Sequence, residues 1–373
     1  MDQSKPHVKK PTIRYNNTPL KVFCLNLKPM RPSFFHHLHP TTIPARQARW
    51  RYTLGAGGLA FFLTIAVALT GLFEMFYYIP TPAEANASIS TISFLVPFGA
   101  LVRNMHYLAS QILVIVSAIH LLRVIFTGAY TPPRRFNYLL GLMLFVLILF
   151  LDFTGYTLRW DNDVHWAIVA GTNLVESIPW VGPGLYRLLI GGSQPGGATL
   201  VRFYTWHIYG LMLTIAILMG WHLFKVRRDG GIAVPPPALR TDPTRITRFE
   251  LVRREALAMI IATIILVLLS AFIPAPIGPP INFQATPAHE ARAPWFFLWI
   301  QQLLKLGDPF LLGVLLPLGI LVFLALIPYI LPLPKPVELG HWFPRGGRLA
   351  QIIVGIIAIA IIVLTLFAWF GKQ

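Results

Sequence analysis

Apolar residues in this chain gather into seven long blocks, which are separated by short stretches rich in Pro, Gly and Arg. Because a helix of about 20 apolar residues crosses the hydrocarbon core of a bilayer, each block predicts one membrane span. A shorter block, residues 164–176, is apolar on one side only and predicts a helix that lies at the membrane surface. The pattern therefore predicts an all-α, polytopic transmembrane helical bundle of about seven spans, near residues 55–79, 104–127, 137–157, 204–225, 256–274, 310–332 and 350–370.

The composition narrows the class of protein. Of the 373 residues, 55% are hydrophobic and only 12% are charged, and the mean hydropathy is +0.63. Soluble domains carry about a quarter charged residues, so an ordinary soluble enzyme and a disordered chain are both excluded. The single cysteine, Cys24, excludes an intramolecular disulfide. It also leaves too few thiols for a zinc or iron–sulfur site built on Cys, or for the CxxCH attachment of a c-type haem.

Lys and Arg are unevenly distributed along the chain. Most of the 31 such residues lie in the N-terminal tail and in the loops that follow the second, fourth and sixth blocks. Because cytoplasmic segments carry the excess of basic residues, this distribution predicts an N-in, C-out orientation. The net charge of +17 then forms a collar that faces anionic lipid, and we expect no nucleic-acid partner. About fifty residues precede the first block, so we expect no cleavable signal peptide.

A stretch rich in Pro and Gly, GGIAVPPPALRTDPTR, interrupts the chain after the fourth block. It resembles a linker between two bundles. We therefore expect four parts: a basic cytoplasmic N-terminal tail (1–50), a four-span domain (51–229), a linker (230–253) and a three-span domain (254–373).

Four of the eleven histidines lie in predicted spans, His106 and His120 in the second and His207 and His222 in the fourth. At about 100° per residue, both spacings return to nearly the same helix face, about 21–23 Å further along the axis. The two helices run in the same direction, so His106 is expected to face His207, and His120 to face His222. Two facing imidazoles suit six-coordinate haem iron, which transfers electrons. The alternatives are interhelical hydrogen bonds, and a transporter or channel with polar histidines.

Small and basic residues accompany these histidines. Gly55, Gly57 and Gly58 begin the first block, where they would let a macrocycle approach the backbone or let helices pack closely. Arg103 and Arg123 flank the histidines of the second span, where each would pair with a haem propionate or extend to the membrane surface. As cofactor-binding residues beside the histidines we choose Gly55, Gly58, Arg103 and Arg123.

Residues 45–370 resemble cytochrome b of the quinol-oxidising bc complexes, in the layout of cytochrome b6 joined to subunit IV. The resemblance rests on LVRNMHYLASQILVIVSAIHLLR with its His-x13-His pattern, on FTGYTLRW, and on FYTWHIYGLMLTIAILMGWHLF with its His-x14-His pattern. It implies a dihaem, cytochrome b6-like four-helix bundle over 51–229 and a subunit IV-like quinol-site domain over 254–373. His106 and His207 would hold the outer of two b-type haems, and His120 and His222 the inner one.

The resemblance also implies an activity and partners. Quinol would be oxidised at an outer quinone site, and one electron would cross the membrane to an inner quinone site, with proton translocation. The other electron would leave through a Rieske-type or substitute iron–sulfur subunit to a c-type cytochrome. We expect a homodimer within a larger complex of the bacterial cytoplasmic membrane. The alternative is a haem b membrane anchor that passes electrons between the quinone pool and a partner subunit without splitting them.

One segment departs from the family's pattern at the outer quinol site. The family has Pro-Glu-Trp-Tyr there, whereas this chain has APWF at 293–296, so Trp295 is kept and the carboxylate is missing. Quinol oxidation releases two protons, so another base must serve. We assign Trp295, Glu290 and Tyr156 to this site, with His289 and Asp161 as further candidates. The alternative is that Glu290 and His289 are solvated loop residues.

A second departure concerns covalent attachment. Thr53 stands where the b6 branch has a cysteine that tethers a third haem, so we expect no covalently attached haem. Cys24 could replace that cysteine only if the tail folded back, and we expect it to be a plain thiol.

For the inner quinone site we choose Asp229 and Arg228, with Arg227 beside them and three tail histidines near them; a basic collar alone is the alternative. These histidines are His36, His37 and His39.

Asp152 lies in the third block amid Leu and Phe. It is either a proton relay or a carboxyl that burial keeps neutral.

Overall fold

The computed structural model describes residues 38–282 and 292–371, and its main elements are seven helical segments long and apolar enough to cross a membrane. They confirm the seven predicted spans. Three of them contain a change of helix type: α9 (Gly197–Thr205), η2 (Trp206–Met212) and α10 (Leu213–Arg228) form one, η5 (Phe310–Leu315) and α13 (Leu316–Ile330) another, and η7 (Arg345–Gly347) and α14 (Arg348–Phe370) the last. The others are α3 (Ala56–Glu74), α5 (Gly99–Phe126), α6 (Arg135–Thr157) and α11 (Arg248–Phe272).

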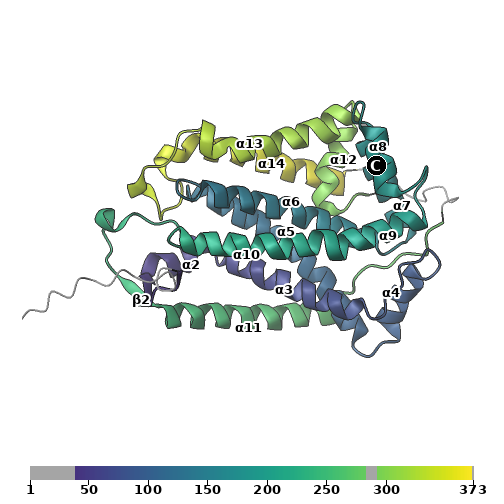
Figure 1. Cartoon of the computed structure of the whole chain (residues 1–373), viewed down its shortest axis with the longest axis horizontal. Helices are drawn as coiled ribbons and strands as arrows, with labels where there is room; N and C mark the ends of the chain where they lie inside the picture. Colours follow the sequence, from purple (N-terminus) through teal and green to yellow (C-terminus); the bar gives the residue numbers. More distant parts are fainter. Residues whose placement is uncertain (1–37, 283–291, 372–373) are drawn as a thin grey trace, which may run out of the picture.

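The first four spans form a bundle in which α3 packs against α5, and α6 packs against α5 and α10. Figure 1 shows α11 along one side of this bundle, and α13 and α14 along the other. The structure thus has the predicted four-span part with three further spans around it. The sidedness of the two ends stays a prediction.

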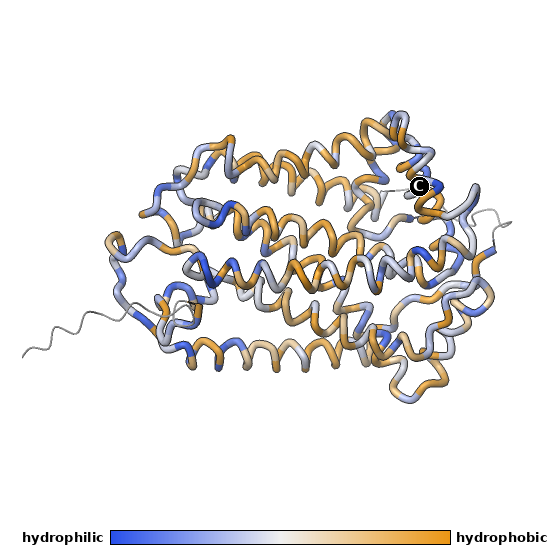
Figure 2. Tube along the Cα trace, viewed as in Figure 1, coloured by the Kyte–Doolittle hydropathy of each residue, from blue (hydrophilic) through white to orange (hydrophobic). Residues whose placement is uncertain are grey.

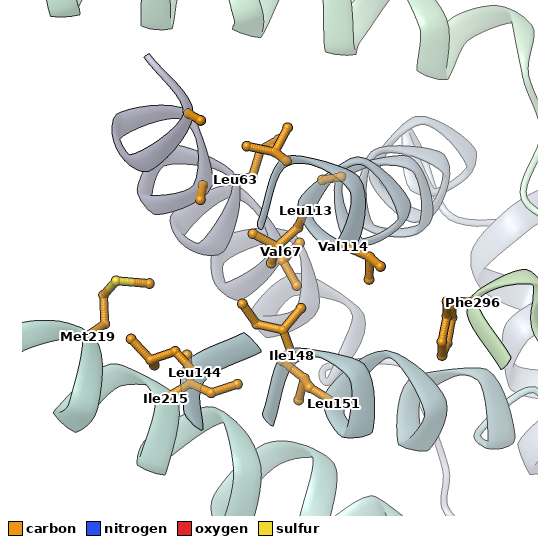
Figure 3. Packing of buried hydrophobic residues seen from close by; sticks show 14 of the residues in the cluster. Leu63, Val67, Leu113, Val114, Leu144, Ile148, Leu151, Ile215, Met219 and Phe296 are labelled. Atoms are coloured by element: carbon orange, nitrogen blue, oxygen red, sulfur yellow. The ribbon is translucent and has the colours of Figure 1, made fainter. Parts of the chain in front are cut away.

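A continuous apolar core joins the four helices. Buried Leu, Ile and Val side chains from each helix meet in the middle of the bundle, and Figure 3 shows Val67, Leu113, Leu144 and Ile215 among them. Phe296, from the segment before α12, closes this core at one end. Burial of each such side chain contributes about 1.5–3 kcal/mol relative to exposure in water.

The outward faces of the spans are apolar as well. Ile217 on α10, Ile260 on α11 and Ile359 on α14 are each more than half exposed, and Figure 2 shows apolar colour along the length of the helices. Polar residues concentrate at the two ends of the molecule. Large apolar surfaces of this kind face lipid or other membrane subunits.

Short elements occupy the two ends. At one end, β1 (Thr42–Pro44) pairs antiparallel with β2 (Arg245–Thr247), so the tail is joined to the segment expected as a linker. That end also holds η1 (Ala45–Ala48), α2 (Trp50–Thr53), η3 (Pro237–Leu239) and η6 (Pro336–Glu338). The other end holds α4 (Ala85–Phe94), α7 (Asn162–Glu176), α8 (Gly182–Ile190), η4 (Trp295–Phe297) and α12 (Leu298–Leu304).

The helix predicted at 164–176 is α7. It begins after Asp161, whose side chain accepts a hydrogen bond from the Val164 amide at 3.0 Å and so caps the helix. α7 packs beside α8 at the end of the bundle, across the ends of the spans (Figure 1).

Candidate functional site

The four intramembrane histidines meet in two pairs. His106 and His207, which we call the first pair, have ring centres 6.3 Å apart, and His120 and His222, the second pair, have ring centres 6.5 Å apart. A metal–imidazole bond is about 2.0–2.1 Å long and a ring centre lies about 1.2 Å behind its nitrogen. Two imidazoles that share one metal ion therefore have centres about 6.4–6.6 Å apart, and both pairs lie within about 0.1 Å of this range.

A π-helical segment explains how unequal spacings produce level pairs. His207 lies in η2, where the hydrogen bonds span five residues, whereas α5 is α-helical throughout. The π-helical turn takes up the one extra residue between His207 and His222. The fifteen-residue step on one helix thus matches the fourteen-residue step on the other.

Hydrogen bonds fix the rings of the first pair. Nδ1 of His106 lies 3.1 Å from the Val67 carbonyl and 3.0 Å from Oγ1 of Thr70. Nδ1 of His207 likewise lies 3.1 Å from the Leu151 carbonyl, and Thr154 supplies a hydroxyl at the same distance. Because a carbonyl can only accept, each Nδ1 must donate its proton. Each Nε2 is then left with a free lone pair, which is what a metal ligand requires.

The second pair differs in this respect. Nδ1 of His120 and Nδ1 of His222 are both buried. That of His120 has no hydrogen-bond partner within the part of the chain that is described, whereas that of His222 has the Asn137 backbone beside it, outside good hydrogen-bond geometry. The two pairs therefore present similar ring separations with different ring hydrogen bonding.

Four glycines make room beside the four rings. A Cβ on Gly71 would lie 2.8 Å from Cε1 of His106, and one on Gly155 would lie 2.8 Å from Cε1 of His207. For the second pair, the same distances are 3.0 Å from Gly57 to His120 and 3.3 Å from Gly141 to His222. Carbon atoms normally stay about 3.5–4.0 Å apart, so the first three positions exclude any larger residue unless the ring moves.

The glycines chosen from the sequence, Gly55 and Gly58, do not contact an imidazole, and their role beside a cofactor stays a prediction. Gly55 lies beside the Trp50 ring with φ +61°, and a Cβ on Gly58 would meet nothing within 4 Å. The residue of that group that faces an imidazole is Gly57. Sequence reasoning missed Gly71, Gly141 and Gly155. The available signal was their spacing, because Gly57 to Gly71 and Gly141 to Gly155 are both fourteen residues apart, like His106 to His120.

The two arginines beside the histidines have different surroundings. Arg103 is buried and donates to the carbonyls of Ala275 and Pro276 and to Ser93 Oγ, so its guanidinium holds the segment after α11. Arg123 is also buried, and its Nε donates to the Tyr52 carbonyl at 3.1 Å. Nη2 of Arg123 is buried without a partner among the described residues, which suits an anionic group such as a propionate.

These features fit a haem between the rings of each pair. Two imidazoles are too few to hold a bare metal ion, so its other ligands would come from a macrocycle. Within residues 38–282 and 292–371, no group of three or more His, Cys, Asp or Glu side chains is placed to hold a metal ion. The donors, the ring separations and the small residues fit a haem whose iron His106 and His207, or His120 and His222, would hold.

Near the first pair, three elements meet through one glutamine. Gln111 of α5 contacts both carboxylate oxygens of Asp152 on α6 with its Nε2, at 3.1 Å each. Its Oε1 accepts a hydrogen bond from Nε1 of Trp295 in η4 at 2.7 Å. Trp295 was chosen from the sequence. Its link to a buried carboxylate was not expected.

The other residues considered for this end are placed as follows. Tyr156 is half-buried, and the Arg159 guanidinium lies over its ring at 4.8 Å from the ring centre. Asp161 is fully buried and forms an ion pair with Arg159 at 2.6 Å. Because Asp161 also caps α7, its carboxylate is part of the framework and is not a free base. Glu290 and His289 lie outside the described residues.

At the opposite end of the bundle, Asp229 follows α10 and is surrounded by cations. It pairs with Arg228 at 3.0 Å and with Lys225 at 3.5 Å, and its carbonyl accepts from Arg134 at 3.0 Å. Asp229 and Arg228, the two residues chosen for the inner quinone site, therefore contact each other.

Only one of the three tail histidines chosen with them is described. His39 lies 3.0 Å from Nη1 of Arg227. Partial desolvation, with the charges of Arg227 and Arg248, lowers the pKa of His39. His36 and His37, like Cys24, lie outside the described residues.

Comparison with known proteins places these features in context. The family model described as cytochrome b (N-terminal)/b6/petB matches residues 111–280. The menaquinol:cytochrome c reductase cytochrome b subunit of Geobacillus thermodenitrificans is 37% identical over 175 residues, which are 47% of this chain and 78% of that protein. The Bacillus subtilis (strain 168) subunit of the same name is 33% identical over 207 residues, 55% of this chain and 92% of that protein.

Two further likenesses extend the comparison. Cytochrome b6 of Heliobacterium modesticaldum is 38% identical over 193 residues, covering 52% of this chain and 88% of that protein. A chain of the solved structure "Hyperthermophilic respiratory Complex III" shares the fold, with a TM-score of 0.75 and 21% identity over 86% of this chain and 85% of that chain.

Proposed function

The chain belongs to the cytochrome b/b6 family, and from this membership we propose that it is the dihaem cytochrome b subunit of a quinol:cytochrome c, or other acceptor, oxidoreductase. In this role it moves electrons across the membrane between an outer and an inner quinone site, with proton translocation. The relatives are named as subunits of menaquinol:cytochrome c reductase and as cytochrome b6, which supports quinol oxidation as the reaction of the complex.

The observation that carries the proposal is that the four histidines face each other as two pairs of imidazoles. Both ring separations suit one shared metal ion, and the first pair is held with each Nε2 free. Haem iron with two imidazole ligands supplies reversible one-electron transfer and has no open position for oxygen. His106 and His207 would hold one haem, and His120 and His222 the other, about 21 Å further along α5.

The chain's own residues have three tasks in this proposal. Val67, Leu151 and their neighbouring threonines orient the first pair through Nδ1. The four glycines leave the space that a macrocycle needs. The partnerless Nη2 of Arg123 offers a donor to a propionate of the second haem.

We place the first pair on the outer side, which follows from the N-in, C-out orientation that the basic residues favour. Trp295 and Tyr156 then line the outer quinone site. Asp229 and Arg228 belong to the inner one, where the carboxylate can take up a proton. Arg228 is the last residue of α10 and Asp229 follows it, at the end of the helix that carries His222.

Other subunits complete the reaction. An iron–sulfur subunit, of Rieske type or a substitute, and a c-type cytochrome would take the other electron. The relatives are named as parts of a cytochrome c reductase, which supports the c-type acceptor. The complex would be a homodimer in the bacterial cytoplasmic membrane, with two b-type haems per chain and no covalently attached haem. A membrane anchor without electron splitting is the second candidate, favoured by Pro294 in place of the family's glutamate.

Haem content in the purified complex tests the proposal. A reduced-minus-oxidised spectrum should show two b-type components per chain, and His106→Ala should remove one of them. The matched control His165→Ala changes a buried histidine of α7 outside the pairs and should keep both. A wild-type complex without a b-type α-band would refute the proposal and support a transporter or channel.

A second measurement separates the two electron-transfer candidates. With the inner site blocked by an inhibitor, addition of an oxidant should increase reduction of the b haems only if quinol electrons are split. A complex that oxidises quinol without this extra reduction is the anchor.

A further inference from the structure

Asp152 is a buried carboxylate in the last third of a membrane span. It lies on α6 with 8% of its surface exposed, one turn before Tyr156. Leu151 beside it belongs to the apolar core and accepts the hydrogen bond of His207. The carboxylate therefore lies at the level of the first pair, just inside the position where Trp295 meets α5.

No cation compensates this carboxylate within residues 38–282 and 292–371. The ion pairs found there all involve other acids, and the groups that hydrogen-bond to Asp152 are neutral: the amide of Gln111 at 3.1 Å and the hydroxyl of Ser110. An ionisable group without a counter-ion is costly inside a membrane protein, and an asparagine could accept the same hydrogen bond at lower cost. A purely structural role leaves the choice of an acid unexplained.

Gln111 links this acid to a residue already assigned to quinol. Its Nε2 binds Asp152, and its Oε1 accepts from Nε1 of Trp295. A carboxylate has about four acceptor sites, and those of Asp152 serve one amide group and the Ser110 hydroxyl, so Asp152 keeps capacity for a further O–H donor. The segment that should carry the family's glutamate has Pro294 next to this same tryptophan.

We propose that Asp152 is the proton-accepting carboxylate of the outer quinol pocket, in the role that Pro294 cannot fill. The inference rests on the proposed function. A quinol O–H bond breaks, the proton forms an O–H bond on Asp152, and the electron passes to a one-electron acceptor of the proposed complex. Gln111 is a positioning residue that holds the carboxylate beside Trp295.

The other acid near this end does not compete for the role. Asp161 is fully buried, paired with Arg159 and bound by the amides of Val164 and Gly278. Its oxygens are occupied in holding α7 and the segment after α11.

The test uses the whole complex with quinol as substrate and compares three variants. Asp152→Asn should lower kcat about 100-fold with KM unchanged, since a positioned proton acceptor contributes about 10²–10⁴-fold. The spectrum and amount of both haems should stay as in the wild type. Asp152→Glu should restore kcat to within about tenfold. The control Asp163→Asn makes the same change on a carboxylate that is 75% exposed, and should leave kcat unaltered.

Several outcomes would overturn the proposal. It fails if Asp152→Asn, with its haems intact, turns over within twofold of the wild type. It also fails if Asp152→Glu is as slow as Asp152→Asn. If wild-type complex does not oxidise quinol at all, the proposed function fails, which is a distinguishable result.

If Asp152→Asn fails to assemble, infrared spectroscopy decides the question. Quinol oxidation by the wild type should produce a carboxylic acid C=O band, and Asp152→Glu should shift its frequency. A missing or unshifted band contradicts the proposal.

Discussion

The glycines beside the imidazoles allow a direct steric test of the haem site. Gly71→Ala places a methyl group 2.8 Å from Cε1 of His106 and 3.3 Å from its Nδ1. Gly58→Ala makes the same change on the same helix, where a Cβ meets nothing within 4 Å. The pair of variants separates the effect of the ring contact from the effect of helix propensity.

The expected magnitudes follow from the geometry. Alanine in place of glycine stabilises a helix interior by about 0.5–1 kcal/mol, and this gain applies to both variants. In Gly71→Ala the methyl group is about 0.7–1.2 Å closer to the ring than carbon atoms normally approach, and such overpacking costs about 1–3 kcal/mol. The ring cannot retreat freely, because Val67 and Thr70 hold its Nδ1. Each 1.4 kcal/mol by which the overlap weakens the binding free energy of haem lowers haem affinity about tenfold.

Haem content and thermal unfolding measure both effects. Gly71→Ala should lose the haem of the first pair on dilution or mild heating while the second component persists. Gly58→Ala should keep both haems and unfold at the same or a slightly higher temperature. The reasoning is refuted if Gly71→Ala retains both components with wild-type amplitude and potential, or if Gly58→Ala loses as much haem as Gly71→Ala.

Three further changes test other parts of the structure. Thr154→Val removes one of the two hydrogen-bond acceptors of His207 Nδ1. The weaker hydrogen bond makes this ligand less electron-rich, so the midpoint potential of its haem should rise by about 40 mV if the bond is worth about 1 kcal/mol, and an unchanged redox titration would contradict this. Asp161→Asn breaks a buried ion pair and should cost about 3 kcal/mol of unfolding free energy, whereas Asp163→Asn on the surface should change it by less than about 0.5 kcal/mol in the same thermal unfolding assay. Glu338 accepts hydrogen bonds from the backbone amides of Lys335 and Gly346, which lower its pKa, so its stabilising contribution is present above the unfolded-state pKa and is lost as pH falls through the folded-state pKa; the protection factor of the Gly346 amide against exchange should therefore fall as pH drops below the ordinary glutamate pKa of about 4.3 in the wild type and show no such step in Glu338→Gln.

The spans could be predicted because the signal for each is local. A block of apolar residues of sufficient length specifies a helix wherever it lies, and α3, α5 and α6 begin and end within a few residues of the predicted blocks. The antiparallel pairing of β1 with β2 is different. It joins Thr42 to Thr247 across more than two hundred residues through strands of three residues, and so short a strand carries no readable alternation.

The histidine pairs illustrate how far spacing can go. Equal rise along two parallel helices was enough to predict which rings face each other. The choice between Gly57 and Gly58 was beyond that reasoning, because neighbouring residues on a helix point about 100° apart and only the contact with α5 decides which one faces the ring. The π-helical turn around His207 was also unpredictable, since the sequence shows an extra residue but not where the helix absorbs it.

The surroundings of α5 show why the three-span part matters to the first pair. Between Arg103 and Gln111, this helix carries His106 and also the side chains that hold the later part of the chain. Arg103 binds the carbonyls of Ala275 and Pro276, Asn104 binds the Ser270 carbonyl and the Ala275 amide, and Gln111 binds Trp295. A displacement of the segment after α11 or of η4 therefore acts on the helix turns that hold the ligand, with no element in between. The same two turns of α5 therefore carry the haem ligand His106 and the glutamine that holds both Trp295 and Asp152. Through Gln111, a carboxylate on α6 lies next to the segment in which the family has its glutamate.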